Sequence, residues 1–187
     1  MKDWQFSLDH MKAVRHALGN CPAGLFMGFD TASAKQDMQQ ATDLVMHLNG
    51  GTFAVRVRRR KPWDKAKQFS QLPDVSVRYY CRGYATEIDK LRKGFGDWYF
   101  FGWSLDNSET LIGWVVLDIN KMREQDVFRR QNYRTKDNEK GRWPVHPNGD
   151  GTYGAYIPLQ ALHDYGCVLQ SHNLTLQRTP EAATLFS

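Results

Sequence analysis

The stretch "PDVSVRYYCRGYATEIDKLRKGFGDWYFFGW", residues 73–103, decides the fold class of this chain. Residues 74–81 alternate apolar and polar side chains with the period of a half-buried strand. Thr86 is a good helix N-cap, acidic residues follow it, and Gly94 ends the short helix that they predict. A dense apolar run, "DWYFFGWS", then indicates a second strand in the centre of a sheet. Strand, helix and strand in this order predict an α/β or α+β protein.

Upstream of this stretch the sequence predicts two helices and a strand. "SLDHMKAVRHAL", residues 7–18, and "AKQDMQQATDLVMHLN", residues 34–49, carry apolar residues at helical spacing. "TFAVRVRRR", residues 52–60, alternates as a strand does, and we expect it to pair with the strand at 74–81. Its apolar residues share one face, so we expect Arg56, Arg58 and Arg60, on the other face, to lie in water.

Downstream, "LIGWVVLDI", residues 111–119, predicts another central strand, and "GDGTYGAYIP" predicts a turn and a last strand. The apolar runs contain Trp98, Trp103 and Trp114, which we expect in the core or at its edge. The whole pattern predicts a single domain, residues 1–187, with a central mixed sheet of about five strands flanked by helices. Its parts are N-terminal helices at about 7–48, a sheet-containing core at about 52–157, and a C-terminal extension at about 158–187.

Composition narrows the class of protein. The 187 residues are 41% hydrophobic, which is enough for one packed core. Lys and Arg number 25 against 20 Asp and Glu, so the net charge of +5 favours a polyanionic partner. The three cysteines have no CxxC spacing, which favours neither a disulfide scaffold nor a zinc site. No window of 18 apolar residues occurs, so we expect a cytoplasmic protein without a membrane partner.

Asp74, Glu87 and Lys90 are candidates for a catalytic site. Mg²⁺ takes hard oxygen ligands, and a lysine beside it can orient or activate the attacking water. Glu87 and Lys90 stand three residues apart on a predicted helix and so share a face. Asp97 precedes the next strand and is a reserve metal ligand. An ordinary structural interpretation stays open, in which Asp74 starts a strand, Thr86 caps a helix, and Glu87 pairs with Lys90 on its surface.

A second candidate site is the basic segment "VRVRRRKPWDKAK", residues 55–67. Arginine binds phosphate in a bidentate manner, and an exposed tryptophan stacks on bases. The segment and the following strand supply the expected nucleic-acid-binding residues, Arg56, Arg58, Arg59, Arg60, Lys61, Trp63 and Arg78. We expect DNA as partner rather than RNA. The alternative is a solvated strand face with no ligand.

The order of these motifs resembles the PD-(D/E)XK nuclease superfamily: a strand opening on Pro73-Asp74, then Glu87-x-x-Lys90, then a hydrophobic strand. The resemblance covers roughly residues 34–157. It implies Mg²⁺-dependent phosphodiester hydrolysis, with Asp74 and Glu87 holding the metal and Lys90 acting on the water. In the family the Glu-x-Lys pair lies on one face of one strand, whereas here the spacing is longer and helical, which favours a rearranged or degenerate site. Asp43 is the only acidic residue that could replace the family's additional glutamate.

More narrowly, "TEIDKLRKGFGDWYFFGW", "WVVLDI" and "NGDGTYGAY" are similar to segments of small uncharacterised proteins of phages and mobile elements. Two functions therefore stay open. The first is a Mg²⁺-dependent nuclease or a degenerate relative of one. The alternative is a non-catalytic nucleic-acid-binding or inhibitory protein of a phage or mobile element. A protein-interaction role for exposed aromatic residues is a third possibility, and the sequence leaves open whether the chain forms a homodimer.

Overall fold

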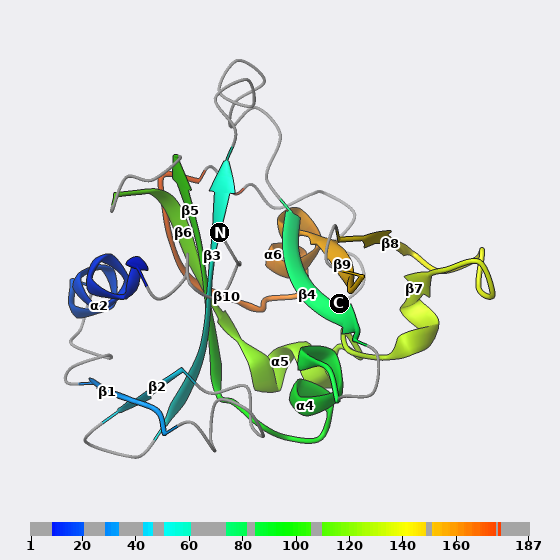
Figure 1. Ribbon diagram of the computed structural model, residues 1–187, viewed down its shortest axis with the longest axis horizontal. Helices are drawn as coiled ribbons and strands as arrows, with labels where there is room; N and C mark the ends of the chain where they lie inside the picture. The colour runs from blue at the N-terminus through cyan, green and yellow to red at the C-terminus, as the bar shows by residue number, and fades with distance from the viewer. Residues whose placement is uncertain are drawn as a thin grey trace, which may run out of the picture.

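The computed structural model describes residues 9–20, 29–33, 43–46, 51–60, 74–81, 85–105, 110–148, 151–174 and 176. Within them the chain forms a six-stranded sheet and a four-stranded sheet, with helices packed beside them (Figure 1). The α/β or α+β class that the sequence predicts is confirmed. The four-stranded sheet was not expected, because the strand patterns predicted one central sheet of about five strands.

The six-stranded sheet is mixed. Its strand order is β1-β2-β3-β5-β6-β10, in which β3 and β5 are parallel and the other neighbours are antiparallel. The apolar strands β5 and β6 lie inside the sheet, as their composition predicted. The strands are β1 (Phe29–Thr31), β2 (Leu44–Met46), β3 (Thr52–Arg60), β5 (Trp98–Leu105), β6 (Leu111–Asp118) and β10 (Val168–His172).

The four-stranded sheet corrects one expected pairing. Its order is β4-β9-β8-β7, formed by β4 (Asp74–Tyr80), β7 (Tyr133–Arg134), β8 (Trp143–Pro147) and β9 (Tyr153–Pro158). We expected β3 and β4 to be neighbours, but β3 pairs with β2 and β5 whereas β4 pairs with β9. An alternating strand shows which of its faces is buried but not which strand lies beside it, so the pattern could not identify the partner.

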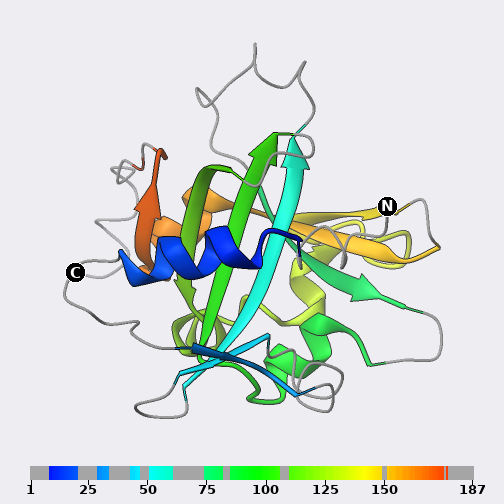
Figure 2. The same cartoon turned by 60° about the vertical axis from the view of Figure 1, so that its left-hand side comes forward.

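The helices cover both sides of the six-stranded sheet. Helix α2 lies across its outer face, as Figures 1 and 2 both show, and confirms the first predicted helix.

No helix in the described ranges combines the length and apolar character needed to cross a membrane. In the described ranges the helices are α2 (Met11–Gly19), α4 (Glu87–Arg92), α5 (Ile119–Glu124) and α6 (Leu159–Asp164), and a 3₁₀ turn, η3, covers Arg130–Asn132.

The second predicted helix, residues 34–49, is wrong where the structure describes it. Leu44 to Met46 form strand β2, which pairs with β1 and β3, while residues 34–42 and 47–49 lie outside the described residues. The range of about 7–48, expected to hold the N-terminal helices, therefore also contains the strands β1 and β2. Three successive apolar residues fit a buried strand as well as a helix face. Here the edge of β3 supplies hydrogen-bond partners, and Leu44 is fully buried.

Two hydrophobic clusters hold the fold together. The first joins the inner face of the six-stranded sheet to the four-stranded sheet and to α4, α5 and α6. The second lies between α2 and the outer face of the six-stranded sheet. Trp103 and Trp114 are buried, and Trp98 is partly buried against the second cluster, as the sequence predicted for all three. The inner cluster fixes how the two sheets face one another and so positions the polar residues described next.

Candidate functional site

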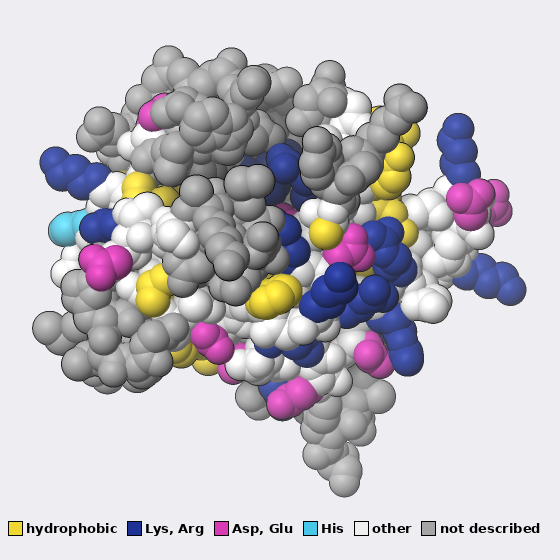
Figure 3. Space-filling model, turned by 60° about the horizontal axis from the view of Figure 1, so that its bottom comes forward, with side chains coloured by type: hydrophobic (Ala, Val, Ile, Leu, Met, Phe, Trp, Pro, Cys, Tyr) yellow, Lys and Arg dark blue, Asp and Glu magenta, His cyan; other side chains and the backbone are white. Residues whose placement is uncertain are grey.

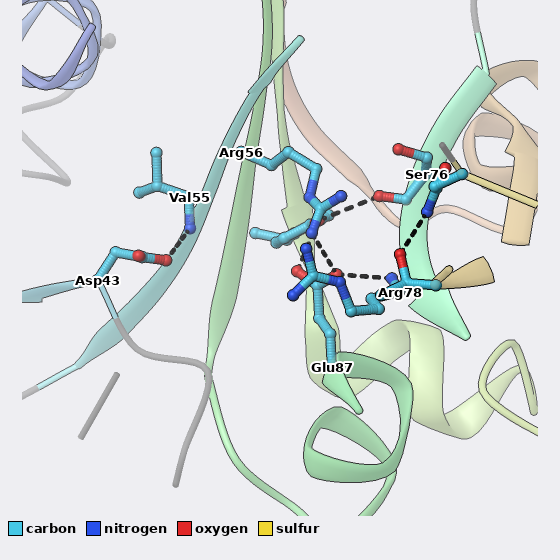
Figure 4. Close-up of polar contacts among 9 residues, drawn as sticks. Asp43, Val55, Arg56, Ser76, Arg78 and Glu87 are labelled. Atoms are coloured by element: carbon cyan, nitrogen blue, oxygen red, sulfur yellow. Dashed lines mark hydrogen bonds and ion pairs between the residues drawn. The ribbon is translucent and has the colours of Figure 1, made fainter. Parts of the chain in front are cut away.

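Glu87, the first residue of α4, lies in the space between the two sheets. Its carboxylate accepts hydrogen bonds from the backbone N–H of Arg78 on β4 (2.8 Å), Nη2 of Arg56 on β3 (3.1 Å) and the hydroxyl of Tyr99 on β5 (2.9 Å) (Figure 4). Both carboxylate oxygens are used, and only 13% of the side chain is exposed. This one residue therefore connects α4 to three strands from both sheets.

Tyr99 stabilises this arrangement. Burial raises the pKa of Tyr99 well above its ordinary value, and the negative charge of Glu87 raises it further. The hydroxyl therefore keeps its proton and donates a hydrogen bond to Glu87. Its oxygen also lies 3.3 Å from the backbone carbonyl oxygen of Ser76 on β4.

Asp74 does not meet Glu87. Asp74 is exposed at the start of β4, where it pairs with Pro158, whereas Glu87 contacts β4 at Arg78. Four residues of extended strand separate these two points by about 13 Å. Lys90 lies one helical turn beyond Glu87 and is half-buried.

Asp97 has a different task at the start of β5. Its carboxylate accepts hydrogen bonds from the backbone N–H of Thr52 (2.8 Å) and from its hydroxyl (3.0 Å). These bonds join Thr52, the first residue of β3, to the residue just before the parallel strand β5. Asp97 and Glu87 share no hydrogen-bond partner among the described residues.

The expected Mg²⁺ site does not fit this arrangement. A shared metal requires carboxylate oxygens to converge on one point. In the described residues Glu87 is bound by three donors, Asp74 lies further along β4, and Asp97 is bound to Thr52. No group of three or more His, Cys, Asp or Glu side chains that could hold a metal occurs in the described ranges. Metal-dependent cleavage stays a prediction.

Arg56 and Arg58 lie on the inner face of β3, where water had been expected. Arg56 forms an ion pair with Glu87 and is 23% exposed, and Arg58 donates to the hydroxyl of Tyr156 (3.3 Å). The guanidinium carbon of Arg58 lies 5.1 Å from the centre of the Tyr156 ring. The second sheet covers this face, which the alternation of β3 could not reveal. The expectation of a solvated basic face is therefore wrong for these two residues.

In the nuclease family a glutamate and a lysine stand two residues apart on one face of a strand, and β3 has two side chains with this spacing. Arg56 and Arg58 stand two apart on one face of one strand, but both are arginines. A guanidinium has no acceptor atom and stays positively charged, so neither residue can be a metal ligand. Asp43 directly precedes the neighbouring strand β2. Its carboxylate accepts a hydrogen bond from the backbone N–H of Val55 (2.6 Å).

The other residues expected to bind nucleic acid have mixed outcomes. The side chains of Arg59 and Arg60, and all of Lys61 and Trp63, lie outside the described residues. Arg78 is half-buried on β4, and Figure 4 shows its side chain pointing toward that of Arg56 beside Glu87.

A second group of cations, not expected as a unit, lies on the surface around α4. Arg92 and Lys93 are exposed and form no ion pair within the described part of the chain. Nη2 of Arg130 lies 2.9 and 3.0 Å from the two carboxylate oxygens of Asp89, which brings the segment containing η3 beside α4. We call this group the α4 basic surface: Lys90, Arg92, Lys93, Arg129 and Arg130.

Figure 3 shows Lys and Arg side chains gathered on the face that carries α4. Two local carboxylates, Asp89 and Asp126, are paired within it with Arg130 and Arg129. Five cations against these two acids leave the surface positive. Lys90, Arg92 and Lys93 are close together in the sequence. Only the folded structure shows that Arg129 and Arg130 lie beside them.

The sequence matches no protein-family model. It matches no curated protein either. The resemblance to the PD-(D/E)XK superfamily therefore rests on the motifs quoted above.

Proposed function

We propose that this protein binds nucleic acid without cleaving it, as a degenerate relative of the PD-(D/E)XK nucleases. The α4 basic surface carries the proposal. Lys and Arg on an open surface attract the phosphate backbone and release its counterions. Arg92 and Lys93 are exposed, and the net charge of +5 has the same sign as the surface. DNA is the proposed partner.

The contacts of Glu87 support the non-catalytic form of this proposal. A metal-binding glutamate needs oxygen lone pairs directed at the cation, but both oxygens of Glu87 accept protein hydrogen bonds. Arg56 beside it places a positive charge where a cation would have to enter. Metal-dependent hydrolysis would require Glu87 to give up these contacts, whereas nucleic-acid binding would not.

The test is fluorescence anisotropy with labelled single- and double-stranded DNA and RNA over a series of salt concentrations. We expect a plot of log K against log salt with a clearly negative slope. Replacing Arg92 and Lys93 by glutamine removes up to two phosphate contacts, so the slope becomes shallower by about 1–2.

The matched control replaces Lys136 and Lys140, two exposed cations of the segment after β7, by glutamine. This control removes the same charge and should leave the slope within about 0.5 of wild type. A salt-independent affinity, or an equal loss in both double variants, would contradict the proposal.

The nuclease hypothesis is tested on the same substrates with added Mg²⁺ or Mn²⁺. We expect binding without strand cleavage. Cleavage that stops in chelator, and that Asp74→Ala and Lys90→Ala each abolish without lowering the melting temperature, would overturn the non-catalytic proposal. Those two residues would then act as the metal ligand and the water-activating group of the first hypothesis.

A further inference from the structure

Three arginines that are not part of the α4 basic surface converge in the space between the two sheets. Arg56 and Arg58 come from β3, and Arg78 comes from β4 of the facing sheet. We call them the inter-sheet arginine cluster. The described carboxylates nearby are Glu87, paired with Arg56, and Asp43, which accepts a hydrogen bond from the backbone N–H of Val55, the residue before Arg56. Three positive charges against two negative charges leave the cluster positive.

Two hydrogen-bond donors, one in this cluster and one on the same strand beside it, have no described partner. Nε of Arg78 is buried without an acceptor among the described residues, and so is Oγ of Ser76. Ser76 is only 3% exposed and lies two residues before Arg78, so both side chains leave β4 on the same face. Buried donors without acceptors are costly and rare in folded proteins. An acceptor group supplied by a ligand would satisfy both.

Aromatic and polar groups border the cluster. Tyr156 pairs with Ser76 across β4 and β9, its hydroxyl accepts from Arg58, and its ring packs against that of His146. Arg56 is 23% exposed and His146 is exposed, so this border of the cluster is in contact with solvent. The two donors are themselves buried, so a group that binds them has to enter between the two sheets past these bordering residues.

We propose that the inter-sheet arginine cluster binds a terminal phosphate monoester, with Arg78 Nε and Ser76 Oγ as donors to its oxygens. A phosphate monoester carries a charge of about −1.5 to −2 at pH 7, and its oxygens are strong acceptors. Arginine recognises such a group through paired N–H donors. The inference rests on the proposed function in taking the monoester to be the end of a nucleic-acid strand.

The enclosure explains why the ligand is a strand end. A phosphodiester inside a strand has chain on both sides, so both sides would need a way out from between the sheets. A terminal monoester needs only one. Because Ser76 is almost completely buried, the part of the ligand that reaches it must be small.

The experiment compares oligonucleotides of one sequence with a phosphate at the 5′ end, at the 3′ end, or at neither. We expect one of the phosphorylated forms to bind at least tenfold more tightly than the form without a terminal phosphate, since hydrogen bonds to a charged group each contribute about tenfold or more. Ser76→Ala and Arg78→Gln should each remove most of this preference. Equal affinity for all three oligonucleotides would overturn the inference.

Ser76→Ala is the sharper variant because it removes a donor that has no described partner, so it should leave the melting temperature unchanged or raise it. Lys12→Gln, an exposed cation on α2 at the outer face of the other sheet, is the matched control and should keep the preference. A preference that survives both Ser76→Ala and Arg78→Gln would also overturn the inference.

A calorimetric titration with a nucleoside monophosphate separates this inference from the proposed function. Binding of the monophosphate that Ser76→Ala weakens, without binding of any oligonucleotide, would support the cluster and contradict nucleic-acid binding. Salt-dependent oligonucleotide binding without a terminal-phosphate preference would support the proposed function and refute the cluster as a phosphate site.

Discussion

A single carboxylate, that of Glu87, stabilises the contact between the two sheets. Its three donors are a guanidinium, a backbone N–H and a tyrosine hydroxyl, which come from β3, β4 and β5. Hydrogen bonds to a charged group stabilise a fold more than those between neutral groups do. Removal of the charge would also break the ion pair between Glu87 and the partly buried Arg56.

Glu87→Gln is therefore expected to lower the free energy of unfolding by about 2 kcal/mol, because hydrogen bonds with a charged partner each contribute about 1.5–3 kcal/mol and glutamine keeps some of them. Urea denaturation measures the change. Glu124→Gln is the control, since Glu124 pairs with Lys121 on the surface of α5 and should cost less than about 1 kcal/mol. Equal losses in the two variants would show that Glu87 is no more than a surface residue.

The cysteines differ in expected reactivity. Burial raises the pKa of Cys167 to about 12, and the nearby charge of Asp118 acts in the same direction. The thiolate is the reactive form, so Cys167 should resist alkylation in the native protein at pH 8, whereas half-buried Cys81 should react sooner. Peptide mapping after brief treatment with iodoacetamide measures this order. Labelling of Cys167 before Cys81 would contradict the expectation.

At the scale of elements, α4 shows how a short helix is fixed at its first turn. Thr86 and Asp89 form a reciprocal capping box, in which the Asp89 carboxylate accepts from the backbone N–H and hydroxyl of Thr86. The same carboxylate binds Arg130. Burial by itself would raise the pKa of Asp89, but the hydrogen bonds from Arg130 and Thr86 outweigh it, so the pKa lies below its ordinary value.

Asp89 should therefore stabilise the fold in a pH-dependent way. A carboxyl whose pKa is lower in the folded state contributes stability above its unfolded pKa, about 3.9, and loses it as the pH falls through the folded value. We expect Asp89→Asn to be less stable than wild type by about 2 kcal/mol at pH 6 and the difference to shrink below about pH 4. Urea denaturation at pH 6, 4 and 3 tests this. A constant difference would mean that packing, and not charge, is lost.

At the scale of the whole molecule, the six-stranded sheet is buried on both faces. Helix α2 covers the outer face through Val14, Ala17 and Leu18, and the second sheet covers the inner face. The nine residues of α2 are too few for a stable helix in isolation, so packing against the sheet must stabilise it.

Leu18→Ala should consequently lower the free energy of unfolding by about 2–5 kcal/mol, because Leu18 is 1% exposed and its truncation leaves a cavity under α2. Thermal and urea denaturation measure the loss. Leu169→Ala on the edge strand β10, where the side chain is 47% exposed, should change stability by less than about 0.5 kcal/mol. Similar effects at both positions would mean that α2 is not docked on the sheet.

Local features of this fold were predictable from the sequence because neighbouring residues produce them. The alternation of residues 52–60 and 74–81, the cap at Thr86 and the apolar density of residues 98–105 each predicted the element that the structure shows. Gly94 ends α4 with a positive φ of 103°, a conformation that glycine adopts without strain. Leu44–Met46 was mistaken for helix because a short apolar run has no period of its own.

Periodicity and capping act over a few residues, so the sequence was enough to predict β3, β4, β5, β6 and β9, the first helix, the cap of α4 and the fold class. Only the tertiary structure decided which strands pair and what Glu87 and Arg56 contact. The donors to Glu87 lie 9, 12 and 31 residues away along the chain. A carboxylate can hold a metal, cap a helix or accept protein hydrogen bonds, and the groups that folding brings within about 3 Å of it decide which. From the sequence, Glu87 was a candidate catalytic residue and Arg56 a candidate solvated cation. In the folded protein the two side chains form a partly buried ion pair between the two sheets.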